Sequence, residues 1–414
     1  MILGDENEVL IFTFARLGRD SVGDENEVLI FTFARLGRDS VGDENEVLIF
    51  TFARLGRARP MIILAVETSC DDTCITILKS KINGDNFEIL SNIVSSQVKI
   101  HAKYGGVFPS LAKREHQKNL PIVLRKALRV AKNPKIDVIA VTVGPGLEPC
   151  LWAGINFAKE LAEKMNLPII PVNHIEAHIL VNLIDRDSTS LKLKNFPAIC
   201  LVVSGGHTQL ILMKGIGKYR ILGETRDDAA GECFDKVARV LGLGYPGGPV
   251  VASEAAKYNI QNTEYKIHLP RPMISTKDYD FSFSGLKTAV LYLVKNLKSE
   301  KKLTKKKVQE ICFESQQSII DVLIKKTIKA AKDYKAKTII LGGGVTANEE
   351  LKRQLKQKIE KEIPRTKYFV PGTEYCTDNA VMTAITALSH LIRKTKNWKK
   401  IIANANLRID ELRP

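Results

Sequence analysis

Two stretches of this 414-residue chain share one pattern: MIILAVETSCDDTCITIL (residues 61–78) and AICLVVSGGHTQLILM (residues 198–213). In each, an apolar run ends in a short polar turn, SCDDT or SGGHT, and a second apolar run follows. This pattern predicts two antiparallel strands joined by a tight turn. Small hydroxyl and glycine residues leave backbone N–H groups free to bind a phosphate. One such turn is more often a plain hairpin, but two of them predict a duplicated fold with a nucleotide held between its halves.

A third glycine-rich turn lies in TIILGGGVTANEELKRQL (residues 338–355). The segment predicts a buried strand, a triple-glycine turn and an amphipathic helix, which Thr346 or Asn348 can cap. Glycines at a strand end let a base or a sugar approach the backbone closely. The third turn therefore favours the nucleotide-binding interpretation of the first two.

Helical spacing of apolar residues alternates with these strands. It is found in residues 116–132 and 313–331, and residues 135–154 predict a strand, a Gly-Pro-Gly turn and a helix. This alternation predicts an α/β protein of about two domains. The predicted units are domain I (61–195, with a metal-binding histidine pair), domain II (196–385, with the nucleotide-binding turns) and a C-terminal helix with a basic tail (386–414).

The N-terminus is repetitive. The unit GDENEVLIFTFARLGRDSV occupies residues 4–22, recurs unchanged at 23–41, and restarts at 42–57. The repeats of solenoid proteins differ in sequence outside their packing positions, so identical copies indicate a recent duplication. Because a clean buried-strand pattern begins only at Met61, we expect residues 1–60 to be an extension outside the fold.

The composition is that of a globular protein, with 44% hydrophobic and 26% charged residues, which excludes a disordered or collagen-like chain. The net charge is +16, and residues 1–60 carry seven Arg against eleven Asp and Glu. Residues 61–414 therefore hold +20, which is compatible with a polyanion-binding surface and equally with a well-solvated lysine-rich one. The seven cysteines form no C-x-x-C pair, which favours reduced thiols and a cytoplasmic location over a disulfide framework.

The segment NHIEAH (residues 173–178) carries two histidines, His174 and His178, at positions i and i+4. On a helix both imidazoles face one side and can share an ion. Glu176 lies toward the other face, unlike the glutamate of the H-E-x-x-H order of zinc proteases. Two surface histidines on a helix are the alternative interpretation.

A third ligand is available in PGTEYCTDNAVMTA (residues 371–384), where Asp378 precedes a helix of small residues. Thr377 and Asp378 can equally be the N-cap of that helix. Two imidazoles with one carboxylate leave coordination positions of a metal open. Such a site suits a metal that acts on a substrate, with iron(II) as the first choice and zinc as the alternative.

Nine motifs occur in order from Met61 to about residue 390: ETSCDDT, HAKYGGVFPSLAKREH, GPGLEPCL, NHIEAH, VSGGHTQL, DDAAGECFDKVARVLGLGYPGGP, FSFSGLKT, GGGVTAN and CTDNA. Together they closely resemble the tRNA threonylcarbamoyl-transferase family in its bacterial or organellar form, once described as glycoproteases. The resemblance implies the fold of actin, hexokinase and the 70-kDa heat-shock ATPase. Ser110 departs from the family, which often has glutamate there, so an acid or base role at that position is in doubt.

The resemblance also implies an activity and a set of site residues. The activity is transfer of a threonylcarbamoyl group from L-threonylcarbamoyladenylate to N6 of adenosine 37, in tRNAs that read codons beginning with A. His174, His178 and Asp378 match the family's ligands for a single metal. Asp71 matches an acidic residue important for activity, either as acceptor of the N6 proton or in an electrostatic role. The substrate-binding positions are matched by Val202, Val203, Ser204, Gly205, Gly206, Asp235, Gly248 and Asn348.

The implied partners are tRNA, a catalytically degenerate paralogue and a small P-loop ATPase, with no membrane involved. A helix within residues 109–131 would contact the paralogue. Candidate tRNA-binding patches, each equally a solvated helix face, are the tail around residues 393–400 and the group Lys298, Lys301, Lys302, Lys305, Lys306 and Lys307. The rival hypotheses are a metallopeptidase, which the position of Glu176 disfavours, and an actin-like ATPase or scaffold without transferase activity.

Overall fold

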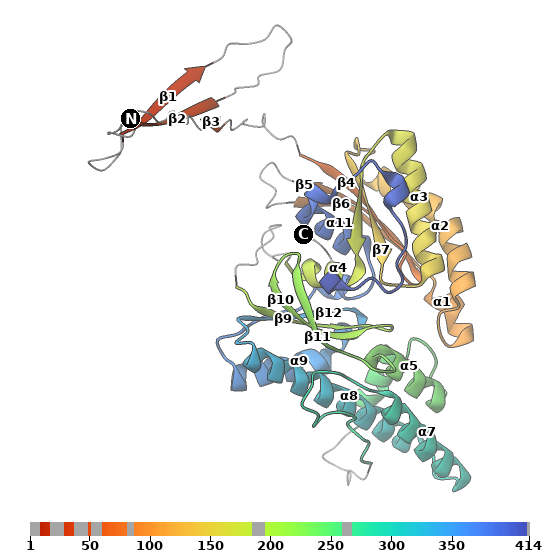
Figure 1. The fold of residues 1–414 in the computed structure, drawn as a ribbon. Coiled ribbons are helices and arrows are strands. Elements are labelled where there is room, and N and C mark those ends of the chain that lie inside the picture. The colour runs from red at the N-terminus through yellow and green to blue at the C-terminus, as the bar shows by residue number, and fades with distance from the viewer. Residues whose placement is uncertain are drawn as a thin grey trace. The chain divides into compact units, whose positions relative to one another are not determined.

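The computed structural model describes residues 9–16, 29–36, 49–50, 60–80, 87–183, 195–258 and 267–411 (Figure 1). The chain divides into two compact units, Met1–Pro60 and Met61–Pro414. In the first unit each copy of the repeat supplies one strand of an antiparallel sheet: β1 (Val9–Arg16), β2 (Leu29–Leu36) and β3 (Ile49–Phe50). The remaining elements belong to the second unit.

The first predicted hairpin is confirmed and begins a five-stranded sheet, here called sheet I. Its order is β6-β5-β4-β7-β8. The β4 and β5 strands pair antiparallel, with Glu67 opposite Cys74, while β7 and β8 extend the sheet in parallel. Its strands are β4 (Ile62–Glu67), β5 (Asp72–Ser80), β6 (Phe87–Ser96), β7 (Val138–Gly144) and β8 (Ile169–Asn173).

The second sheet, sheet II, repeats this design in the order β11-β10-β9-β12-β13. Three strands again form an antiparallel meander, and two parallel strands follow. The duplication predicted from the two hairpins is therefore present in the topology of both sheets. The strands are β9 (Ala198–Val203), β10 (Thr208–Gly215), β11 (Lys218–Glu224), β12 (Thr338–Gly342) and β13 (Lys367–Phe369).

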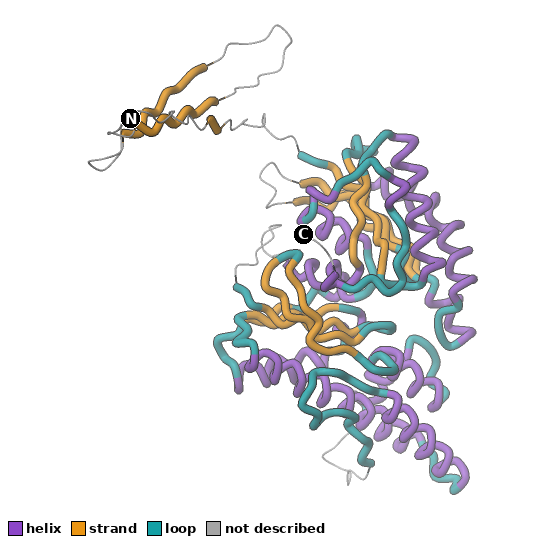
Figure 2. Tube along the Cα trace, viewed as in Figure 1, coloured by secondary structure: helices purple, strands orange, loops and turns teal. Residues whose placement is uncertain are grey.

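Helices cover both sheets (Figure 2). In the first half they are α1 (Val98–His101), α2 (Pro109–Val130), α3 (Glu148–Met165) and α4 (His174–Leu180). In the second half they are α5 (Ala230–Leu241), α6 (Gly247–Ala256), α7 (Ser284–Ser299), α8 (Lys305–Asp333), α9 (Glu349–Glu362) and α10 (Thr373–Cys376). Among the described helices none has both the length and the apolar composition needed to span a bilayer.

One apolar core joins the two halves. It contains Ile63 and Ala65 of β4, Cys200 of β9 and Ile340 of β12, all without exposed surface. The last helix, α11 (Ala380–Ser389), lies in this core and contacts α4 and the strands of sheet I. Its small residues are buried all round, which allows close packing on several sides.

The C-terminal region returns to the first half of the fold. Helix α11 packs against sheet I, and no α-helix follows it among described residues 390–411. That segment contains only the 3₁₀ turns η5 (Leu391–Arg393), η6 (Trp398–Lys400) and η7 (Ile409–Glu411). It returns along sheet I, where Thr395 bridges Ile169 and the Asn404 N–H donates to the Val143 carbonyl. The division at residue 385 remains a prediction, as does the boundary near residue 195.

The triple-glycine turn follows β12 as predicted and passes through the 3₁₀ turn η4 (Gly344–Ala347) into α9. Gly343 has φ +88°, and a Cβ placed there would overlap the Val203 carbonyl.

We expect Gly343→Ala to lower the free energy of unfolding by about 1–3 kcal/mol, which is the usual cost when a residue other than glycine adopts this backbone conformation. Thermal unfolding measures this, with Gly344→Ala as control because a Cβ there meets nothing within 4 Å. Equal stabilities of the two variants would contradict the prediction.

Candidate functional site

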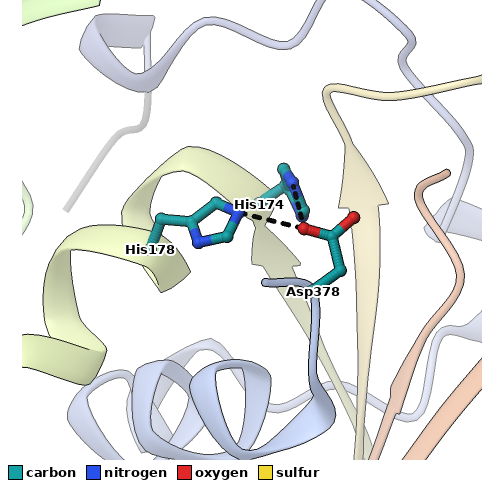
Figure 3. A group of neighbouring side chains, drawn as sticks. All are labelled: His174, His178 and Asp378. Carbon is teal, nitrogen blue, oxygen red and sulfur yellow. Dashed lines mark hydrogen bonds and ion pairs between the residues drawn. The ribbon is translucent and has the colours of Figure 1, made fainter. Parts of the chain in front are cut away.

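The two histidines of NHIEAH and Asp378 lie together between the sheets (Figure 3). The helix α4 begins at His174, and His178 follows one turn later. Asp378 Oδ1 lies 3.6 Å from His174 Nε2 and 3.1 Å from His178 Nε2. The predicted common face of the histidines and their convergence with Asp378 are both present in the structure.

The helix-cap alternative for Asp378 does not hold. The cap of α11 is Asn379, whose Oδ1 accepts a hydrogen bond of 3.1 Å from the Met382 N–H. The Asp378 side chain is therefore free to face α4, and only 19% of it is exposed.

A buried carboxylate that sequence reasoning missed orients His174. Glu67, the last residue of β4, has no exposed surface, and its Oε2 lies 3.3 Å from His174 Nδ1. The same carboxylate accepts hydrogen bonds of 2.6 Å from the Ser69 N–H and from the Thr142 hydroxyl. A carboxylate on Nδ1 directs Nε2 and its lone pair toward an ion. The only signal in the sequence was one acidic residue at the end of an otherwise apolar strand.

Burial and charge act against each other at these groups. Burial lowers the pKa of His174, but the carboxylates of Asp378 and Glu67 outweigh it and raise that pKa to about 9. Burial would raise the pKa of Asp378, but His174 and His178 hold it well below its usual value. The pKa of His178 is lowered, chiefly by burial. The site thus holds ionised oxygen donors beside imidazole nitrogens in a dry environment.

Glu176 points away from this group. Its Oε1 lies 2.7 Å from His390 Nε2, and its Oε2 lies 3.6 Å from Arg393 Nη1. A peptidase of the H-E-x-x-H type needs its glutamate beside the metal-bound water. The orientation of Glu176 therefore argues against the metallopeptidase hypothesis.

The donor set fits one divalent ion. The ligand atoms of His174, His178 and Asp378 all lie within 4.8 Å of one another. Two nitrogen donors and one carboxylate form the open set typical of a metal that acts on a substrate, as opposed to a closed structural site. Glu67 Oε2 and Ser69 Oγ both lie within hydrogen-bond distance of His174 Nδ1, which leaves Nε2 of that ring to face Asp378.

The predicted nucleotide-binding turn follows β9, in which Val202 and Val203 are fully buried. The Ser204 hydroxyl accepts hydrogen bonds from the N–H groups of Gly206 (3.3 Å) and His207 (3.0 Å). Gly205 and Gly206 are exposed, and a Cβ at either would meet nothing within 4 Å. Burial, together with the positive charge of His174 and His178, lowers the pKa of His207 to about 4.

The other predicted substrate-binding residues lie on or next to helices of the second half: Asp235 within α5, Gly248 in the first turn of α6 and Asn348 at the N-cap of α9. Asp235 on α5 accepts a 2.6 Å hydrogen bond from the Gly247 N–H, and Gly248 lies beside it with open space over its Cα. The Asn348 side chain caps α9 through the Leu351 N–H and donates to Gln316 Oε1. Thus Asp235 keeps a carboxylate oxygen available, whereas both ends of the Asn348 amide already have partners. Their roles toward a substrate remain predictions.

Asp71 lies in the turn between β4 and β5. Its carbonyl accepts a 3.0 Å hydrogen bond from the Gln97 N–H. Its Oδ2 is buried and has no hydrogen-bond partner in the part of the chain that the structure describes. Burial, followed by the negative charge of Asp378, raises the pKa of Asp71. A carboxylate in this condition is suited to receiving a hydrogen bond or a proton from a bound molecule.

Comparisons with known proteins identify the family of this chain. Residues 88–385 match the family model described as tRNA N6-adenosine threonylcarbamoyltransferase. A relative of that name from Thermosipho africanus is 46% identical over 84% of this chain and 100% of its own length. One from Listeria monocytogenes is 41% identical over 85% of this chain and 97% of its own.

Among solved structures, full-length HypF in a phosphate- and nucleotide-bound form has a TM-score of 0.52 at 13% identity, covering 82% of this chain and 56% of that one. This likeness concerns the fold alone, which is of the actin-like ATPase type. The family match spans most of the chain, and the two relatives are covered nearly end to end. The chain therefore belongs to the tRNA N6-adenosine threonylcarbamoyltransferase family.

Proposed function

We propose that this chain transfers the threonylcarbamoyl group of L-threonylcarbamoyladenylate to N6 of adenosine 37, in tRNAs that read codons beginning with A. The observation that carries the proposal is the convergence of His174, His178 and Asp378 in a chain of this family. The amine nitrogen N6 attacks the carbamoyl carbon. The bond from that carbon to the anhydride oxygen breaks, and AMP leaves with the electron pair.

Positioning is the main task of the residues, because a mixed anhydride already has a good leaving group. The Gly205 amide binds the phosphate, and the absence of a side chain at Gly206 leaves the approach to it open. Asp235 accepts a hydrogen bond from a ribose hydroxyl. Gly248 leaves room for the nucleoside. The N6 proton passes to Asp71 Oδ2, which has no other partner among the described residues. An electrostatic role for Asp71 is the alternative.

His174, His178 and Asp378 hold the metal, which we assign as iron(II) with zinc as the alternative. A divalent ion held by these ligands would supply Lewis acidity toward the carbamoyl group. Glu67 keeps the His174 ring in its ligating orientation. Both histidines are buried, so their ring nitrogens are shielded from bulk water.

The pH dependence of substrate binding tests the role of Asp235. Burial raises its pKa to about 6, so the carboxylate is ionised above that pH and protonated below it. We expect the KM for the adenylate to rise as the pH falls below about 6, by up to about tenfold per pH unit. In Asp235→Asn the KM should be high and nearly independent of pH. Steady-state kinetics between pH 5 and 8 measure this effect, with Glu232→Gln on the same helix as the control. The role of Asp235 would be refuted if Asp235→Asn kept the parental pH profile, as Glu232→Gln should.

We also propose partners and a location. The chain acts in the cytoplasm with a catalytically degenerate paralogue and a small P-loop ATPase. The exposed face of α2 carries the apolar residues Ile122 and Val130, which suit a paralogue helix. The exposed lysines around residues 298–306, at the end of α7 and the start of α8, offer one surface for tRNA phosphates.

A transfer assay tests the proposed activity. Purified full-length chain, with iron(II) and with the partner subunits of a relative, is mixed with threonylcarbamoyladenylate and unmodified tRNA. Mass spectrometry of the digested tRNA should show N6-threonylcarbamoyladenosine, and AMP should form in equal amount. ATP hydrolysis by the chain alone, without any modified nucleoside, would favour the rival ATPase or scaffold hypothesis.

A further inference from the structure

Two aromatic side chains that the proposed chemistry leaves unused lie exposed near the site. Tyr104 ends the 3₁₀ turn η1 (Ala102–Tyr104), and Phe108 immediately precedes α2. Their rings stack with centroids 5.9 Å apart and planes 28° apart. Tyr104 is 62% and Phe108 52% exposed. Large aromatic rings are normally buried, so an exposed stacked pair indicates a binding surface.

Hydrogen bonds fasten this loop to the turn that carries Asp71. The Phe108 N–H donates to His101 Nδ1 at 3.3 Å, and His101 Nε2 lies 3.1 Å from Gln97 Oε1. The Gln97 N–H in turn donates to the Asp71 carbonyl. The start of α2 is held to the same turn, because His116 Nε2 donates to the Cys70 carbonyl at 2.9 Å. The aromatic pair therefore has a fixed position relative to the proposed proton acceptor.

The loop also contacts the half of the molecule that carries the nucleotide-binding residues. Arg239 of α5 donates a hydrogen bond to the Gly105 carbonyl, between the two aromatic residues. Asp235 lies one helical turn earlier on the same helix. The pair is thus attached on one side to the turn of Asp71 and on the other to the helix of Asp235.

Positive charge surrounds the pair. Lys103 precedes Tyr104, while Lys113 and Arg114 follow Phe108 in the first turns of α2, and all three are exposed. Within the described ranges none of them forms an ion pair with a carboxylate. Exposed aromatic faces flanked by unpaired cations are the combination that binds single-stranded nucleic acid, the rings stacking on bases and the cations on phosphates.

We propose that Tyr104 and Phe108 form a stacking platform for unpaired bases of the tRNA anticodon loop next to the target adenosine, with Lys103, Lys113 and Arg114 on the flanking phosphates. This inference rests on the proposed tRNA substrate and adds the residues that present the adenosine to Asp71. A nucleotide adjacent to the target, stacked on this pair, keeps the target base out of the loop's own stack. Both rings are positioning residues, since neither touches the reacting atoms.

Base fluorescence tests the platform directly. An unmodified anticodon stem-loop RNA carries 2-aminopurine at the nucleotide immediately 3′ of the target adenosine and is titrated with the full-length chain. Stacking on an aromatic ring should quench the fluorescence. Tyr104→Ala/Phe108→Ala should remove the quenching and raise the Kd by about tenfold or more. Tyr104→Phe/Phe108→Tyr, which keeps both rings, should retain the parental Kd and quenching.

Tyr292→Ala on α7 is the matched control, because Tyr292 is 61% exposed and lies on a helix outside this loop. It should bind and quench like the parent. The platform proposal would be overturned if the double alanine variant kept the parental quenching and Kd, or if the parent chain caused no quenching. Either result would favour a protein partner as the ligand of the two exposed rings.

The transfer assay on the same preparations separates this inference from the proposed function. A double alanine variant with a raised KM for RNA and an unchanged kcat supports the platform. Quenching by a parent chain that transfers no threonylcarbamoyl group would refute the function while retaining the platform. Transfer by the parent with parental RNA binding in the double variant would refute the platform alone.

Discussion

His174→Ala should abolish both metal binding and formation of N6-threonylcarbamoyladenosine, as should Asp378→Ala. Each change removes one of three converging donors, whose ligand atoms lie within 4.8 Å of one another. Two remaining protein ligands hold a divalent ion weakly, so metal content should fall to background, and the transfer rate should drop by at least about a hundredfold. Elemental analysis of the purified variants and mass spectrometry of the digested tRNA measure the two effects.

The control for this prediction is His268→Ala, which removes an exposed histidine outside the site. It should retain parental metal content and activity. A His174→Ala variant that folds, lacks metal and still modifies tRNA at the parental rate would exclude the metal from the reaction. Thermal unfolding of each variant separates loss of the ion from loss of the fold.

Glu67→Gln should weaken metal binding by about 10–100-fold while the chain still folds. The amide keeps the size of the carboxylate, and its oxygen can still accept from the Ser69 N–H or the Thr142 hydroxyl. It cannot supply the negative charge that lies 3.3 Å from His174 Nδ1. The carboxylate no longer strengthens His174 as a ligand, and the pKa of His174 in the metal-free protein should fall from about 9. Metal titration and an NMR titration of the histidine measure the two effects.

A second buried carboxylate provides the matched control. Glu314, like Glu67, has no exposed surface, but it pairs with Arg271 in the second half of the molecule. Glu314→Gln should lower stability without changing metal affinity or the pKa of His174. Equal metal affinities in the two variants would contradict the orienting role of Glu67.

Local patterns account for what could be predicted from sequence. The paired hairpins follow from apolar runs interrupted by polar turns, and the spacing of His174 and His178 is a property of one helix turn. These features depend on neighbours in the chain. The likeness of the two hairpins also indicated the duplicated sheets, although neither sheet's pairing is local.

The features that escaped prediction depend on contacts between distant segments. Glu67 and His174 are far apart in sequence, so nothing near Glu67 shows that an imidazole compensates its burial. Asn379 and not Asp378 caps α11, a competition between neighbours that side-chain types alone do not decide. The packing of α11 against sheet I likewise requires the fold, because a helix of small residues suits several faces.

The most direct test of the account is to express the full-length chain in cells depleted of their own transferase and to quantify N6-threonylcarbamoyladenosine in their tRNA by mass spectrometry. A His174→Ala/Asp378→Ala variant is expressed in parallel. The account predicts that the parent restores the modified nucleoside and that the variant, at equal abundance, does not. No restoration by a folded parent chain bound to the host's partner subunits would contradict the transferase function, and restoration by the variant would contradict the role of the metal site.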